Sequence, residues 1–106
     1  DDMILYEVKA NKQPIGGAEY LNREPFANHS INLLADDCIY MFSDGIADQF
    51  GGDSDKKFKR SNLGQLLMES HNLSMEEQHK IIRRSWESWK GESEQVDDIC
   101  MVGVKI

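Results

Sequence analysis

Residues Cys38 to Asp48 read CIYMFSDGIAD, and this stretch decides the fold. Its first six residues, up to Ser43, form a nearly continuous apolar run, which is typical of a strand buried on both faces of a sheet. The run ends on Asp44, which is followed by Gly45. The sequence therefore predicts a buried strand that delivers a carboxylate to one end of a sheet.

A second pair of carboxylates precedes the last apolar run. Asp97 and Asp98 stand just before Ile99 to Ile106, which is rich in valine and isoleucine and predicts a final strand. If the two strands pair antiparallel, Asp44 and Asp97 meet at one rim of the sheet. Their repulsion would favour a bridging cation, and Mg²⁺ and Mn²⁺ prefer such oxygen ligands. On spacing alone, both aspartates are explained more simply as turn or capping residues.

Two more strands are predicted before Cys38. Apolar residues alternate with polar ones from Met3 to Ala10, and Ser30 to Ala35 reads as a second strand that ends in a turn at Asp36 and Asp37. Between them, Pro14 to Gly17 is irregular, because proline removes a backbone donor and paired glycines permit positive φ.

Two helices are predicted between the two apolar runs. The first covers Asn62 to Ser70, with its leucines on one stripe. The second opens at Ser74, which forms a capping box with Glu77, and stops at Gly91. Strands followed by two helices and a last strand predict an α+β fold with a mostly antiparallel sheet. The second helix is expected to pack through Met75, Ile81, Ile82, Trp86 and Trp89.

The composition is that of a soluble globular domain, or part of one, with 106 residues, 40% hydrophobic and 29% charged. No apolar run approaches the roughly 20 residues of a membrane span. No signal core precedes the first predicted strand, so we expect a piece of a longer cytoplasmic protein. The net charge of −7 argues against nucleic acid as a partner. The one basic cluster favours a solvated loop over a phosphate-binding patch; it comprises Lys56, Lys57, Lys59 and Arg60.

The cysteines and histidines give little indication of a site. Cys38 and Cys100 both lie in apolar runs, which favours buried free thiols, with a disulfide as the alternative. The histidines have no carboxylate or nucleophile at a convincing spacing, so surface positions are the better interpretation; they are His29, His71 and His79.

The two carboxylate stretches together resemble the signature of the metal-dependent protein phosphatases, the protein phosphatase 2C superfamily. Cys38 to Asp48 resembles that family's apolar strand running into Ser-Asp-Gly, and Gln95 to Val102 (QVDDICMV) resembles its last motif. The whole chain is similar to the bacterial branch that includes stage II sporulation protein E (SpoIIE). Shorter likenesses occur at Lys12 to Gly17 (KQPIGG), the turn at Asp37, Gln49 to Gly52 (QFGG) and Trp89 to Gly91 (WKG).

The resemblance implies that Asp44 and Asp97 are catalytic residues that bind the metals of a two-metal Mn²⁺ or Mg²⁺ site. It implies a supporting role for Asp98 and a tight backbone turn at Gly45. Residues 1–106 would form the C-terminal part of the phosphatase domain, a partial β-sandwich with two helices inserted before the last strand. The family's first half, which carries another metal-binding aspartate, has no match here. Asp36 stands where the family usually has glycine.

The resemblance further implies a phosphoserine/phosphothreonine protein phosphatase, the output domain of a bacterial signalling protein. A metal-activated water would hydrolyse a phosphoprotein substrate, in the cytoplasm or in the cytoplasmic part of a membrane-anchored sensor, without direct membrane contact. The alternative is a catalytically degenerate phosphatase-like domain that serves as an interaction module. Half of a sandwich leaves apolar strand faces unpaired. We therefore expect the isolated chain to be inactive and to form a homodimer.

Overall fold

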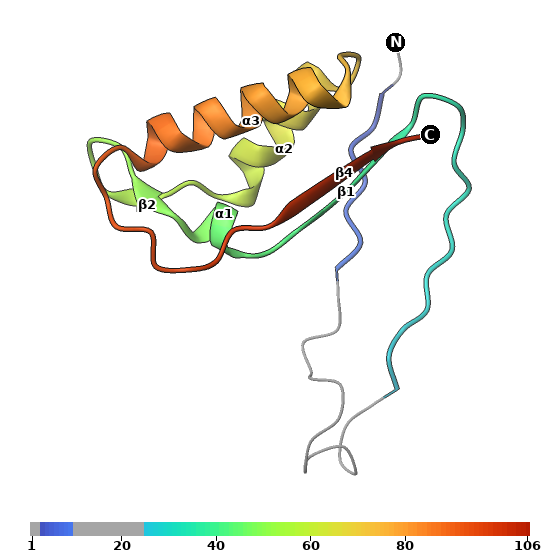
Figure 1. Ribbon diagram of the computed structural model, residues 1–106. Helices are drawn as coiled ribbons and strands as arrows, with labels where there is room; N and C mark the ends of the chain where they lie inside the picture. The colour runs from blue at the N-terminus through green and yellow to red at the C-terminus, as the bar shows by residue number, and fades with distance from the viewer. Residues whose placement is uncertain (1–2, 10–24) are drawn as a thin grey trace. The chain divides into compact units, whose positions relative to one another are not determined.

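The computed structural model describes residues 3–9 and 25–106. It divides into a larger unit, Leu33–Ile106, and a smaller one within residues 2–32. The larger unit holds every helix and strand of the described residues (Figure 1). Their order is β1 (Cys38–Phe42), α1 (Gly45–Asp48), β2 (Phe50–Gly51), β3 (Lys56–Lys57), α2 (Arg60–Ser70), α3 (Met75–Lys90) and β4 (Met101–Lys105).

The strands form two small antiparallel sheets. β1 pairs with β4 in a register that runs from Cys38 opposite Lys105 to Phe42 opposite Met101. β2 pairs with β3 as a short hairpin. The predicted α+β class is therefore confirmed, with α2 and α3 inserted before the last strand.

The core lies between the helices and the sheets. α2 and α3 lie side by side, and α2 contributes the buried Leu63 and Leu67 while α3 contributes Ile82 (Figure 1). Trp86 and Trp89 pack against this core as predicted, and the indole N–H of Trp86 donates to the carbonyl of Ile46 at 3.1 Å. Among the helices described, none is long and apolar enough to cross a membrane.

Both ends of α3 match the sequence prediction. The hydroxyl of Ser74 accepts a hydrogen bond from the backbone N–H of Glu77 at 3.2 Å, which satisfies a donor that the first turn leaves unpaired. Gly91 ends the helix at a φ of 54°, a conformation that favours glycine. The capping box and the glycine thus located this helix from sequence.

The two strand predictions upstream of β1 are wrong. Residues 3–9 and 30–35 contain no strand, while Ala10 and the segment from Lys12 to Gly17 lie outside the described residues. An alternating pattern indicates which side chains share a face, but a strand also needs a neighbour to accept and donate its backbone hydrogen bonds. The described part of the chain supplies no such neighbour to either segment.

Two short features were not predicted. α1 has 4 residues and the β2–β3 ladder has two pairs, so neither is long enough to show a periodic pattern. The predicted turn before β1 is present, and Asp36 adopts a φ of 72° there. Aspartate tolerates this left-handed region better than most residues, which explains how it replaces the family's usual glycine.

The cysteines are free, as expected, but they are not both buried. Cys38 is half-buried and Cys100 is exposed. Cys38 lies opposite Lys105 at one end of the β1–β4 ladder, whereas the carbonyl of Cys100 accepts from Ser43 beyond the other end. The alternative of a disulfide between them is therefore excluded by the register.

Candidate metal centre

Asp44 and Asp97 lie at the same end of the β1–β4 ladder. Phe42 opposite Met101 is the last pair, and beyond it the N–H of Ser43 donates to the carbonyl of Cys100 at 2.9 Å. Asp44 directly follows Ser43, and Asp97 precedes Cys100 by three residues. The predicted antiparallel pairing of these two strands is thus confirmed.

The side chain of Ser43 links the two segments at this end of the ladder through hydrogen bonds. Its hydroxyl accepts from the backbone N–H of Cys100 at 3.0 Å and donates to the carbonyl of Asp98 at 3.0 Å. One side chain therefore holds the turn that carries Asp97 and Asp98 against the end of β1. Sequence reasoning assigned Ser43 no role, although a small hydroxyl residue at the end of an apolar strand was a signal for such a link.

Gly45 brings the backbone after Asp44 into direct contact with the same turn. A Cβ on Gly45 would lie 2.4 Å from the carbonyl oxygen of Asp98 and 3.2 Å from the Cβ of Asp97. The positive-φ glycines of the described residues are Gly52 and Gly91, so Gly45 is not required for a left-handed turn. The expected role of Gly45 is corrected accordingly: glycine is needed here for close approach.

The acidic side chains at this end face solvent. Asp44, Asp97 and Asp98 are all exposed. Asp44 immediately precedes α1, yet its side chain makes no capping hydrogen bond with that helix. The structure gives no support to Asp44 as a helix cap, but Asp44 does lie in the turn between β1 and α1, as its simpler interpretation as a turn residue expects. Its exposed carboxylate is open to a ligand.

The donor set fits a hydrated divalent cation only in part. Mg²⁺ and Mn²⁺ sites combine a few carboxylates with several waters, so two exposed aspartates can supply part of such a site. Within residues 3–9 and 25–106, no group of three or more His, Cys, Asp or Glu side chains is placed to hold a metal. A carboxylate separation on the order of 4–6 Å for Asp44 and Asp97 stays a prediction.

The histidines of the larger unit lie on or next to its two long helices. His71 follows α2, and its Nδ1 lies 2.7 Å from the carbonyl oxygen of Met68. His79 is an exposed residue of α3. His29 belongs to the smaller unit, where it is exposed.

Comparisons with known proteins show the family and the fold of this chain. The family model described as stage II sporulation protein E (SpoIIE) matches residues 1–106. Among solved structures, the chain is similar to the SiaA-PP2C domain of Pseudomonas aeruginosa, with a TM-score of 0.74 and 23% sequence identity. That match covers 76% of this chain and 33% of the other, so the chain spans about a third of that structure. No curated protein sequence matches the chain.

Proposed function

This chain belongs to the stage II sporulation protein E (SpoIIE) family, and from that premise we propose that it works as part of a metal-dependent phosphoserine/phosphothreonine protein phosphatase. The observation that carries the proposal is the position of Asp44 and Asp97 at one end of the β1–β4 ladder, joined through Ser43. The similarity in fold to a domain named PP2C supports it.

The chain is proposed to be the C-terminal part of the phosphatase domain. It covers 33% of the length of the similar structure, so a complete domain would contain substantially more chain. The two aspartates would be this part's share of the ligands, and the remaining acidic ligands would come from the rest of the domain. A complete site of this kind needs more oxygen donors than two carboxylates provide.

Each residue of the rim has a distinct task in this proposal. Asp44 and Asp97 would hold two Mn²⁺ or Mg²⁺ ions, while Ser43 and Gly45 keep the two carboxylate-bearing segments in contact. The ions would supply Lewis-acid activation of water and neutralise the charge of the substrate phosphate. The substrate would be a cytoplasmic phosphoprotein, with the domain as the output of a signalling protein.

The proposal is tested by neutralising each aspartate in the full-length protein. Asp44→Asn and Asp97→Asn should each lower kcat/KM towards a phosphoserine peptide by at least about 100-fold, because a neutral amide binds a hard cation poorly. Thermal unfolding in metal-free buffer should change little, since both side chains are exposed. Calorimetric titration with Mn²⁺ should show weaker binding for both variants.

His79→Ala is the matched control, because His79 is equally exposed but lies on α3. It should keep both the activity and the affinity for Mn²⁺. Near-normal turnover by Asp44→Asn at saturating Mn²⁺ would refute the assignment of that residue. A full-length wild-type protein that binds no Mn²⁺ and hydrolyses no phosphopeptide would favour the alternative of a degenerate interaction module.

A further inference from the structure

The basic cluster of the sequence lies against the helix that starts beside Asp44. The Nζ of Lys57 is 3.5 Å from the carboxylate of Asp48, the last residue of α1. The backbone N–H of Lys59 donates to the carbonyl of Ala47, also in α1, at 2.8 Å. α1 has 4 residues and begins next to Asp44, so these lysines lie against the other end of the same short helix.

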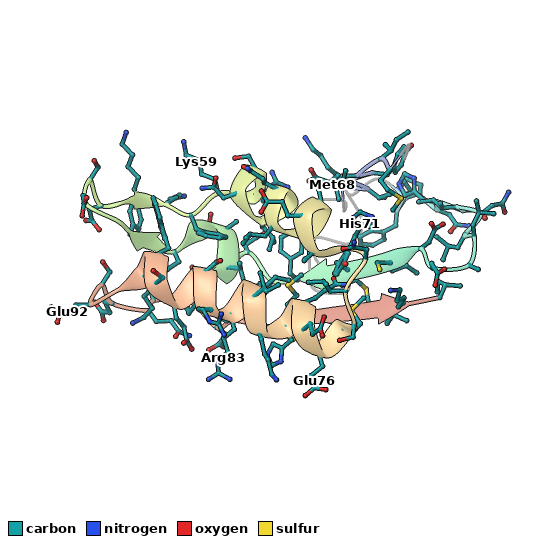
Figure 2. All side chains as sticks on the ribbon, turned by 90° about the horizontal axis from the view of Figure 1, so that it is seen from above. Lys59, Met68, His71, Glu76, Arg83 and Glu92 are labelled. Atoms are coloured by element: carbon teal, nitrogen blue, oxygen red, sulfur yellow. The ribbon has the colours of Figure 1, made fainter. Side chains whose placement is uncertain are left out.

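The lysines point away from the core. Phe58, between them, is 4% exposed, and its ring packs edge-on against Trp89 with centroids 6.1 Å apart. Lys57, in β3, and Lys59, which adopts a φ of 75° just before α2, are both exposed. Figure 2 shows Lys59 at the start of α2, on the side away from α3.

The hairpin that carries Lys57 is anchored and is not a free loop. The N–H of Gly52 donates to the carbonyl of Trp89 at 2.8 Å, and the indole of Trp89 donates to the carbonyl of Lys56 at 3.1 Å. At Gly51 the backbones approach so closely that a Cβ would lie 1.9 Å from the carbonyl oxygen of Trp89. The hairpin therefore presents its lysines in a fixed place beside α1, which a solvated loop would not do.

An exposed aromatic ring lies next to Lys57. Phe50 is 46% exposed, and the Nζ of Lys57 lies 6.0 Å from the centre of its ring. A lysine ammonium at this distance from a ring is attracted to it, which helps to hold Lys57 beside Phe50. We call Phe50, Lys57 and Lys59 the lysine patch. The acidic residues of the hairpin, Asp53 and Asp55, lie in the turn at its other end.

The charge of the patch selects the chemistry of its partner. The chain carries a net charge of −7, so an acidic segment would be repelled by most of its surface. The lysine patch is a local exception, and it lies against α1, the helix that begins next to Asp44. We propose that the lysine patch binds an acidic stretch of the protein substrate that flanks the phosphorylated serine or threonine. This inference rests on the proposed phosphatase function, because it assigns the substrate preference of the same site.

The test compares two phosphoserine peptides that differ only in three flanking residues, glutamate in one and alanine in the other. Dissociation constants are measured by fluorescence anisotropy with the full-length protein in metal-free buffer, and kcat/KM is measured with Mn²⁺. The wild-type protein should show a lower dissociation constant and a higher kcat/KM for the acidic peptide than for the neutral one. The Lys57→Gln/Lys59→Gln variant should lower that preference about fivefold, the size expected for two exposed ionic contacts, and should bind the neutral peptide as wild type does.

Two further variants separate docking from a structural effect. Asp48→Asn removes the carboxylate that competes for Lys57, so it should raise the preference for the acidic peptide, whereas loss of a merely structural ion pair would give no such rise. Lys80→Gln is the matched control, since Lys80 is an exposed lysine paired with Glu76 at 3.7 Å on α3, and it should leave the preference unchanged.

The anisotropy measurements test peptide binding separately from hydrolysis. Equal affinity of wild type for the two peptides, or a preference that survives Lys57→Gln/Lys59→Gln, overturns the lysine patch and leaves the phosphatase proposal standing. An acidic preference in binding with no hydrolysis of either peptide supports the patch and counts against the proposed phosphatase function.

Discussion

At Gly45, the packing of the backbone against the turn at Asp97 and Asp98 and the shape of the proposed metal site depend on one residue. It follows Asp44 as the first residue of α1, and its α-carbon faces the turn that carries Asp97 and Asp98. The atom nearest to an added Cβ is a backbone oxygen, which cannot rotate away as the end of a side chain could. Any larger residue must therefore push this turn and the end of β1 apart.

We predict that Gly45→Ala destabilises the fold by about 1–3 kcal/mol, the usual range for overpacking, and also weakens the binding of Mn²⁺. Gly91→Ala is the comparison, because a Cβ there meets its nearest atom at 4.0 Å and only the φ of 54° is unfavourable. It should cost about 1–3 kcal/mol through backbone strain alone and leave metal affinity unchanged. Chemical denaturation and Mn²⁺ titration of both variants check this. If Gly45→Ala bound Mn²⁺ as tightly as wild type, the close approach at Gly45 would not be needed for metal binding, and this part of the prediction would be wrong.

Among the elements, those with strong local signals were predicted best. α3 carries its own capping box, stop signal and apolar stripe, so its limits follow from residues within or next to it. β1 and β4 were found because each is a dense apolar run. The segments at 3–9 and 30–35 carry similar patterns, but pairing depends on a neighbour that no local pattern encodes.

Gln78 joins three parts of the larger unit and was missed entirely. It is 1% exposed, accepts a hydrogen bond from the hydroxyl of Tyr40 in β1, and donates to the carbonyls of His71 and Leu73 at 3.4 and 3.0 Å. Burial, with the neighbouring Cys38 thiol, raises the pKa of Tyr40 above its ordinary value, so its hydroxyl remains a donor at neutral pH. A glutamine in a predicted helix gives no sign that it will be buried.

Gln78→Ala should therefore cost about 1–3 kcal/mol, because it removes the acceptor of the Tyr40 hydroxyl and the buried amide that donates to the carbonyls of His71 and Leu73. Gln65→Ala is the control. Gln65 is an exposed residue of α2 that bonds only to Glu69 among the hydrogen bonds described for it, at 3.2 Å. Its replacement should change stability by less than about 0.5 kcal/mol. Urea denaturation of the two variants measures the difference, and equal costs would contradict a central role for Gln78.

At the scale of the whole molecule, the helices and strands of the larger unit leave one face of the β1–β4 sheet open. Ile39 and Met41 of β1 lie opposite Val104 and Val102 of β4, and all four side chains are exposed. The opposite face carries Tyr40, Phe42 and Met101, which pack against the core. We propose that a second copy covers this outer face when the 106-residue chain is alone in solution, because burial of large apolar side chains favours association.

Sedimentation equilibrium should then give a dimer for the 106-residue chain at micromolar concentration, with no hydrolysis of phosphopeptide. Met41→Lys should yield a monomer, since it places a charge at the centre of the proposed interface. Val96→Lys should remain dimeric, because Val96 is 80% exposed but lies in the loop between α3 and β4. A monomeric wild-type chain, or loss of association in both variants, would rule out this face as the contact.

The candidate site could be predicted from sequence only as far as its two strands. The Asp44 and Asp97 motifs follow and precede apolar runs, and antiparallel pairing then brings them to one end of the sheet. The hydroxyl of Ser43, the close approach at Gly45 and the anchoring of the hairpin on Trp89 depend on three-dimensional contacts between distant segments. No spacing rule predicts such contacts.

The pairing of β1 with β4 also has a consequence for how the chain folds. Phe42 and Met101 are neighbours in the ladder although about 60 residues separate them, and both long helices lie within that span. Closing so long a loop costs more conformational entropy than forming the local hydrogen-bonded turns of α2 and α3. We therefore expect the helical hairpin to form before β1 pairs with β4, the step that brings Asp44 and Asp97 to one end of the ladder. Metal affinity should then report on the completed topology of the chain, and helix content alone should not.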